Sequence, residues 1–148
     1  MSQNLNQART FTFADISIGD KHSYSYVITA DTYKKFLEAY EDFSPVHIDE
    51  KYAKSRGFAG LVMHGAILNG FISHFIGMYF PGKFSLLLAV DLRFANPSYQ
   101  GDTIQLESIV TQKLDSRNIL VLDLVLHNST QTNVAARSRI QVMIKEQM

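Results

Sequence analysis

The chain has 148 residues, no cysteine, and 14 basic residues against 14 acidic ones, so its formal net charge is zero. Hydrophobic residues make up 46% and charged residues 19%, a composition typical of a globular domain and not of a disordered chain. The lack of cysteine excludes disulfides, thiolate nucleophiles and cysteine-ligated metal centres. Zero net charge argues against nucleic acid as a partner, because such binding depends on many basic residues. We expect one domain over residues 1–148.

The amino-terminal residues 1–10 are polar and carry no apolar core, so we expect a poorly ordered tail and not a signal peptide. The apolar segment Phe58–Phe80 has the length of a membrane span. It contains His64, Asn69 and His74, however, and this favours a helix buried inside a globular protein. We therefore predict a cytoplasmic protein with no membrane partner.

Near the amino terminus, imperfect alternation of apolar and polar residues predicts a strand at His22–Thr29. A helix follows, with Thr29 or Asp31 as its N-cap. It ends near Asp42, because Pro45 disfavours helical backbone in the residue before it. The apolar face of this helix has the spacing i, i+3, i+4, i+7 and consists of Tyr33, Phe36, Leu37 and Tyr40.

Two more helices are predicted in the middle of the chain. Asp49 is placed as the N-cap of a short helix, Glu50–Ser55, which Gly57 ends. The apolar helix covers Gly65–Tyr79, and Pro81-Gly82 terminates it.

After the apolar helix the period of the apolar residues changes to two, which predicts strands separated by turn residues. Short connections favour an antiparallel meander, and an apolar helix needs a curved sheet to cover it. The fold class is therefore α+β, an antiparallel sheet wrapped around a long central apolar helix. The predicted strands are Ser85–Ala95, Thr103–Leu114, Ile119–His127 and Val134–Ile144.

The densest polar cluster beside apolar sequence contains Asp42 and His47. A carboxylate and an imidazole five residues apart can reach one small substrate if the chain between them turns, whereas extended they would lie about 17 Å apart. Such a pair commonly moves one proton on and another off. A capping role for Asp42 and an ordinary loop position for His47 remain open. A metal site at His47 and Asp49 is not expected, since no third ligand is suggested nearby.

The start of the apolar helix is the second candidate site. At Gly65 the unpaired backbone N–H groups and the positive end of the helix dipole could stabilise a developing oxyanion. The alternative is that this glycine only allows close packing. No Asp or Glu occurs from Lys51 to Val90, so a mechanism that needs a carboxylate on this helix is excluded.

Three linked segments carry a resemblance to a known family: Tyr40–Asp49, Phe58-Ala59-Gly60 and Met63-His64-Gly65. They resemble the MaoC-like, (R)-specific enoyl-CoA hydratase family of the hotdog fold. Its signature is an aspartate, a spacer that is usually Asn-Pro, then His-x-Asp, and later His-Gly at the start of the central helix. The resemblance extends over about residues 22–144 and includes Phe94-x-x-Pro97 and Gly101-Asp102.

The resemblance implies that Asp42 and His47 hold one water. His47 would take a proton as this water adds to C3 of a trans-2-enoyl thioester, and Asp42 would deliver a proton to C2, which yields an (R)-3-hydroxyacyl thioester. The backbone N–H of Gly65 would bind the thioester carbonyl, and Ser44, Ser73 and His64 would have supporting roles. No cofactor or metal is implied, since coenzyme A belongs to the substrate. At least a homodimer is implied, and an acyl-carrier-protein thioester is a second possible substrate.

Ser44 departs from the family pattern, because asparagine usually precedes the proline. This leaves catalytic rate and substrate choice open. Two other functions remain: a hotdog acyl-thioesterase, although such enzymes commonly place a carboxylate on the central helix, and a non-catalytic subunit that binds acyl thioesters.

Overall fold

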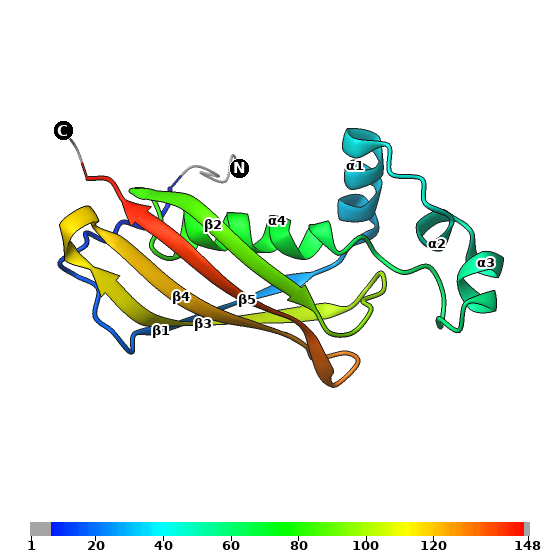
Figure 1. Ribbon diagram of the computed structural model, residues 1–148. Helices are drawn as coiled ribbons and strands as arrows, with labels where there is room; N and C mark the ends of the chain where they lie inside the picture. Colours follow the sequence, from blue (N-terminus) through cyan, green and yellow to red (C-terminus); the bar gives the residue numbers. More distant parts are fainter. Residues whose placement is uncertain (1–6, 147–148) are drawn as a thin grey trace.

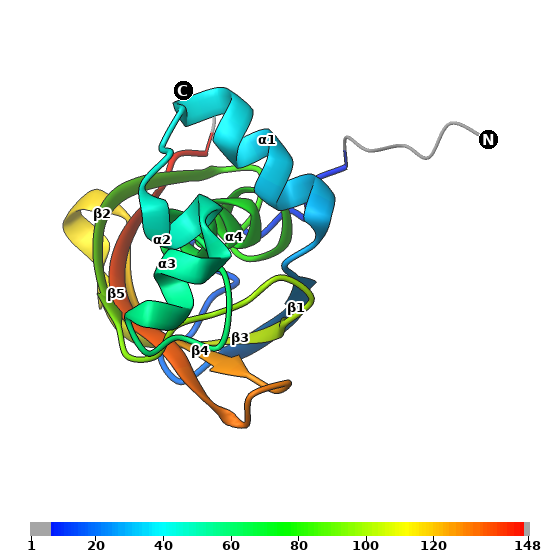
Figure 2. The ribbon, with the colours of Figure 1, turned by 90° about the vertical axis from the view of Figure 1, so that its right-hand side faces the viewer.

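The computed structural model describes residues 7–146. Five strands form one antiparallel sheet that curves around the helix α4, while α1, α2 and α3 extend beyond one end of the sheet (Figures 1 and 2). This confirms the predicted architecture. The elements in chain order are β1 (Lys21–Val27), α1 (Ala30–Tyr40), α2 (Pro45–Ile48), α3 (Glu50–Ser55), α4 (Ala66–His74), the π-helical turn η1 (Phe75–Tyr79), β2 (Ser85–Phe94), β3 (Thr103–Leu114), the 3₁₀ turn η2 (Asp115–Arg117), β4 (Ile119–Asn128) and β5 (Asn133–Ile144).

The strand order is β1-β3-β4-β5-β2, which corrects the predicted meander of the last four strands. β3, β4 and β5 do form consecutive antiparallel hairpins, but β2 pairs with β5 and lies at the far edge from β1. The chain between β2 and β3 therefore crosses about 14 Å of sheet, three strand spacings, which its eight residues can easily span. A twofold apolar period identifies strands, but it carries no information about their neighbours.

The core lies between the concave face of the sheet and α4. Alternate residues of β4 and β5 face it, and on β5 they include Ala136, Ile140 and Val142, all fully buried. From the helical side Ile72 and Phe75 are also fully buried. Burying each such large side chain stabilises the fold by roughly 1.5–3 kcal/mol.

The central helix is less regular and less enclosed than predicted. Its α-helical part ends at His74 and continues as η1 up to Tyr79. Asn69 and Ser73 share a face that is exposed, because one sheet covers only one side of the helix. The expectation of a helix buried all round is wrong on this face.

The amino-terminal segment is described from residue 7, so part of the expected tail lies outside the described residues. Within the described part, the N–H of Arg9 donates to the carbonyl of Met78 at 2.9 Å, and Thr10 forms a β-bridge with Gly82. Over residues 7–146, no helix has both the length and the apolar character that crossing a membrane requires.

Candidate active site

Asp42 lies at a sharp turn directly after α1. Thr29 caps the start of this helix by accepting from the N–H of Thr32 at 3.0 Å, so of the two predicted N-caps Thr29 is correct. Glu41 ends the helix in the left-handed conformation, with φ of 52°. The carboxylate of Asp42 then accepts a hydrogen bond from the N–H of Ser44 at 3.2 Å. These local bonds hold the Asp42 loop at the end of the sheet.

His47 lies on α2, a single helical turn that the sequence pattern did not predict and that begins at Pro45. The Tyr33 hydroxyl donates to the carbonyl of His47 at 2.7 Å, and burial raises the pKa of this hydroxyl, so it remains a donor. The Nδ1 of His47 lies 2.6 Å from the carbonyl oxygen of Val62. Because a carbonyl only accepts, Nδ1 of His47 is the donor, and Nε2 is the ring nitrogen that remains available to exchange a proton with a ligand.

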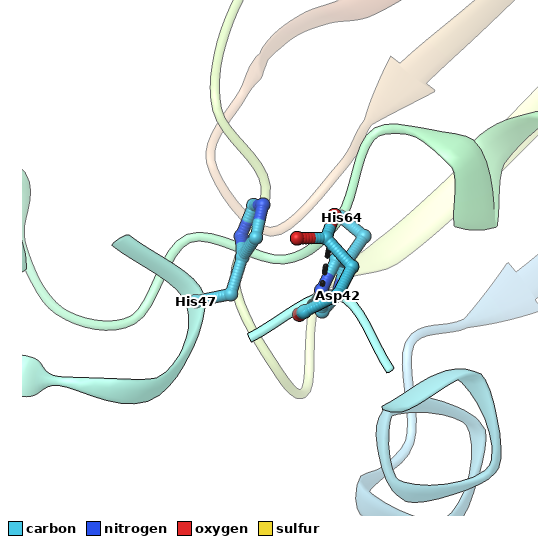
Figure 3. Close-up of side chains that lie close together, drawn as sticks. All are labelled: Asp42, His47 and His64. Atoms are coloured by element: carbon cyan, nitrogen blue, oxygen red, sulfur yellow. Dashed lines mark hydrogen bonds and ion pairs between the residues drawn. The ribbon is translucent and has the colours of Figure 1, made fainter. Parts of the chain in front are cut away.

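His64 joins the two candidates. Its Nε2 donates to the carbonyl of Asp42 at 2.9 Å, and its ring lies against the ring of His47, with centroids 3.8 Å apart (Figure 3). His64 is buried, and its Nδ1 has no hydrogen-bond partner among the described residues. This histidine therefore fixes the Asp42 loop and α2 relative to one another.

The three side chains form one compact group. One ligand or proton-transfer atom from each of Asp42, His47 and His64 lies within 4.8 Å of the others. The Asp42 side chain is 51% exposed, whereas that of His64 is 2% exposed, so the group opens to solvent on the Asp42 side. A carboxyl group and an imidazole at this separation can act together on one small molecule such as water.

Gly65 follows His64 and lies directly before α4. Its φ of −58° and ψ of −31° are accessible to any residue, so its requirement for glycine comes from space. A Cβ on Gly65 would lie 2.7 Å from Cζ of Phe94. The backbone N–H of Gly65 donates no hydrogen bond within the described residues and can therefore bind an oxygen of a ligand. Gly65, Phe94 and the loop after β2 line a hollow of about 300 Å³.

Comparison with known proteins decides the family. The model of the MaoC like domain matches residues 13–132. The chain belongs to the MaoC-like domain family. It is 31% identical over 107 residues to an (R)-specific enoyl-CoA hydratase of Aeromonas caviae, covering 72% of this chain and 80% of that protein.

Two further relatives agree with this assignment. The structure of the R-hydratase PhaJ1 from Pseudomonas aeruginosa in the unliganded form superposes with a TM-score of 0.86 at 26% identity, covering 96% of this chain and 90% of that one. A mitochondrial 3-hydroxyacyl-[acyl-carrier-protein] dehydratase of Arabidopsis thaliana is 28% identical over 60% of this chain and 52% of its own length. The MaoC-like chain thus has the hotdog fold of a hydratase and dehydratase family.

The structure separates two residues from the Asp42 group of this MaoC-like domain. Asp49 caps α3 by accepting from the N–H of Tyr52 at 3.0 Å, as predicted. Ser73 lies eight residues beyond Gly65, about 12 Å along the helix. It lines another hollow of about 770 Å³ between α1 and α4. The structure therefore gives Ser73 no contact with the other candidates within this chain.

The structure groups His47 with Asp42 and His64, and Asp49 is not part of this group. The three groups could geometrically surround a metal ion. Each histidine has one nitrogen against a carbonyl oxygen, His47 against that of Val62 and His64 against that of Asp42. Metal-ligating histidines commonly have the same arrangement, so these bonds do not argue against a metal ion. The absence of a metal remains a prediction.

Sequence reasoning missed the contacts that orient His47. Tyr33 was assigned only to the apolar face of its helix, and the carbonyl of Val62 carries no sequence signal. The phenol and the carbonyl are brought to His47 by α1 and by the segment before α4.

Ser44 contributes to the group through its backbone N–H, and its hydroxyl makes no hydrogen bond within residues 7–146. We expect Ser44→Ala to change hydratase activity by less than about threefold, because any residue other than proline supplies the same N–H donor. Steady-state kinetics with an enoyl thioester check this. Ser44→Pro, which removes the donor, is the contrasting variant. A loss of activity in Ser44→Ala comparable to that in Ser44→Pro would show that the hydroxyl matters.

Proposed function

We propose that this protein interconverts trans-2-enoyl-CoA and (R)-3-hydroxyacyl-CoA. The observation that carries the proposal is the group of Asp42 and His47 beside the open backbone N–H of Gly65 at the start of α4. The named activities of the relatives support the same reaction class.

In the proposed mechanism one water binds between the carboxyl group of Asp42 and Nε2 of His47. The water oxygen adds to C3, and Nε2 takes one of its protons. The electron pair of the C2–C3 double bond moves toward the thioester carbonyl, whose oxygen the N–H of Gly65 stabilises. A donor of this kind is typically worth about 3 kcal/mol in the barrier.

The proposed reaction starts with the Asp42 carboxyl group protonated and His47 neutral. Asp42 delivers its proton to C2, and the proton that His47 took from water then passes to the Asp42 carboxylate, which restores the starting state. The thioester itself makes C2 acidic, and the proposed reaction therefore uses neither metal nor organic cofactor.

Purified protein mixed with crotonyl-CoA tests the proposal. We expect loss of the conjugated enoyl absorbance, with formation of the (R)-3-hydroxy product on chiral analysis. The same assay with an enoyl-carrier-protein thioester measures which carrier is preferred. Release of free thiol would instead indicate the thioesterase, and tight binding without turnover would indicate the non-catalytic subunit.

One specific observation favours the hydratase over the thioesterase. The segment Lys51–Val90, which includes α4, has no side-chain carboxylate. The Asp42 carboxylate, from the loop after α1, lies 3.8 Å from Nε2 of His64, just before α4. A hydrolytic mechanism that uses a helix carboxylate has no residue to supply it.

We also propose that two copies of this chain pair through β2. This strand is at the sheet edge and presents exposed apolar side chains, including Leu86 at 53% and Leu88 at 44%. An open apolar edge promotes pairing with another strand, and a symmetric dimer would close it.

The dimer prediction is tested by Leu88→Glu. We expect sedimentation velocity at micromolar concentration to give a dimer for the wild type and a shift toward monomer for the variant. Leu114→Glu, which changes a 45% exposed leucine at the end of β3, is the matched control and should remain dimeric. A wild-type monomer would contradict the proposal.

A further inference from the structure

We propose that Asp102 is a positioning residue for the proposed reaction. Its carboxylate holds the loop between β2 and β3, and this loop holds the segment whose carbonyl orients His47. The inference rests on the proposed function, because it takes His47 as the base that accepts a proton from water. In the sequence Asp102 was only one position of a matched motif, and no role was expected for it.

Asp102 is a buried acidic residue whose hydrogen-bond donors are neutral. It lies directly before β3 and is 2% exposed. Its Oδ2 accepts from the side-chain amide of Asn128 at 2.6 Å and from the N–H of Tyr99 at 2.9 Å, and its Oδ1 accepts from the side-chain amide of Gln131 at 3.2 Å. A carboxylate that is taken out of water depends on such donors to replace its lost solvation. The same bonds therefore fix the three donating groups around one point.

Two of the three donors belong to the sheet and its hairpin, and the third belongs to the loop. Asn128 is the last residue of β4, and Gln131 lies in the turn between β4 and β5. Tyr99 lies in the loop between β2 and β3. The backbone at the end of this loop is also held, because the N–H of Ile28, just after β1, donates to the carbonyl of Asp102 at 2.9 Å. Asp102 thus fastens the loop to the sheet.

The same loop holds the segment that leads into α4. The N–H of Met63 donates to the carbonyl of Ser98 at 2.8 Å. Four residues earlier, the N–H of Ala59 donates to the hydroxyl of Tyr99 at 3.2 Å. Both acceptors belong to the stretch that the Asp102 carboxylate holds through the N–H of Tyr99. The position of residues 59–63 is therefore set by a loop that Asp102 fastens.

Val62, between these two contacts, is where the segment meets the proposed base. Its carbonyl oxygen lies 2.6 Å from Nδ1 of His47, and its N–H donates to the carbonyl of Val46 at 3.1 Å. A shift of the segment would rotate the His47 imidazole or break its bond, and either change moves Nε2 relative to Asp42. A displacement of about 1 Å at a reacting group can lower a rate by about 10²-fold. Asp102 acts on the reaction through these contacts and touches no substrate.

The kinetic test compares Asp102→Ala and Asp102→Asn in the crotonyl-CoA assay. Asp102→Ala removes the acceptor for all three donors, so we expect kcat to fall at least about tenfold while KM changes less than about threefold. Asp102→Asn keeps an oxygen that can accept from the N–H of Tyr99 and should recover most of kcat. Asp102→Ser, whose single short hydroxyl cannot replace three acceptors, is used with the same expectations if the alanine variant does not fold.

Lys113→Met is the matched control. At the opposite end of β3, Nζ of Lys113 holds another loop by donating to the carbonyl of Phe13 at 2.7 Å and to that of Ile16. This variant should lower the thermal unfolding temperature and leave kcat unchanged. A normal kcat in folded Asp102→Ala, or an equal fall of kcat in Lys113→Met, would overturn the inference.

A spectroscopic measurement without substrate separates this inference from the proposed function. The Nδ1 proton of His47, held by the Val62 carbonyl, should give a downfield imidazole N–H signal in the proton NMR spectrum, which His47→Gln removes. We expect Asp102→Ala to shift this signal upfield or to lose it by exchange with water, whereas Asp102→Asn and Lys113→Met keep it.

The two proposals then fail in different ways. Wild type that shows the signal but does not hydrate crotonyl-CoA, with the signal changed in Asp102→Ala, would refute the reaction and support the contact chain from Asp102 to His47. An unchanged signal in Asp102→Ala would overturn the role of Asp102 even if wild type is an active hydratase. Absence of the signal in wild type would overturn it too, since no bond to Val62 would then orient His47.

Discussion

Asp42→Asn and His47→Gln are each expected to lower the rate of crotonyl-CoA hydration by about 10²- to 10⁴-fold, the usual contribution of a general acid or base. The amide introduced by Asp42→Asn cannot supply a proton to C2, and the amide introduced by His47→Gln cannot accept one from water. Both replacements keep similar shape and hydrogen-bonding ability, so the fold should persist. Initial rates of absorbance loss, measured at saturating substrate, check the expectation.

Two matched controls accompany these variants. Asp49→Asn changes the nearest similar aspartate, which caps α3, and asparagine caps a helix about as well. His127→Gln changes a histidine on the outer face of β4, where it lies 3.6 Å from Glu107. Both controls should retain wild-type rates. Activity that survives in Asp42→Asn and His47→Gln as well would remove the basis of the proposed function.

His64→Phe is expected to lower kcat by about tenfold or more while KM changes little. The phenyl ring keeps the contact with His47, but the donor to the carbonyl of Asp42 is lost. An unpaired carbonyl in this partly buried place costs about 1–3 kcal/mol of folding stability, and the Asp42 loop is less well held. Rate measurements and thermal unfolding of the same preparation separate the two effects.

Two further variants test whether His64 positions Asp42. His64→Gln keeps an N–H donor and should recover part of kcat, which a general packing role would not explain. His74→Phe, at the end of α4, removes a ring nitrogen that lies 2.9 Å from the Tyr26 hydroxyl, away from the Asp42 group. This control should lower stability without changing kcat. A normal kcat in His64→Phe would show that His64 does not position Asp42.

Elements with strong local signals were predicted almost to the residue. Asp49 caps α3, whose bounds Glu50–Ser55 match the prediction, and β3 covers Thr103–Leu114 as expected. Capping and a twofold period depend on neighbouring residues only, so a sequence reports them directly. The turn α2 was missed because a four-residue helix is too short to show a period.

The candidate site was predicted in part. Asp42, His47 and Gly65 were singled out by residue type, spacing and resemblance, and the structure brings them to one end of the sheet. Ser44 was singled out because it replaces the usual asparagine, and in the structure its backbone N–H donates to the Asp42 carboxylate. Ser73 lies in a separate hollow. Such roles depend on where a side chain points, which spacing along the chain does not specify.

By itself the sequence determined the fold class, the bounds of most helices and strands, and the segments that carry the chemistry. All of these follow from local period, capping and short motifs. Only the tertiary structure decided that β2 lies at the edge beside β5, that His64 contacts both Asp42 and His47, and that Phe94 stands against Gly65. The physical reason is that these contacts join residues far apart along the chain. Which of these residues meet depends on how the sheet curves around α4, and no local sequence pattern specifies this.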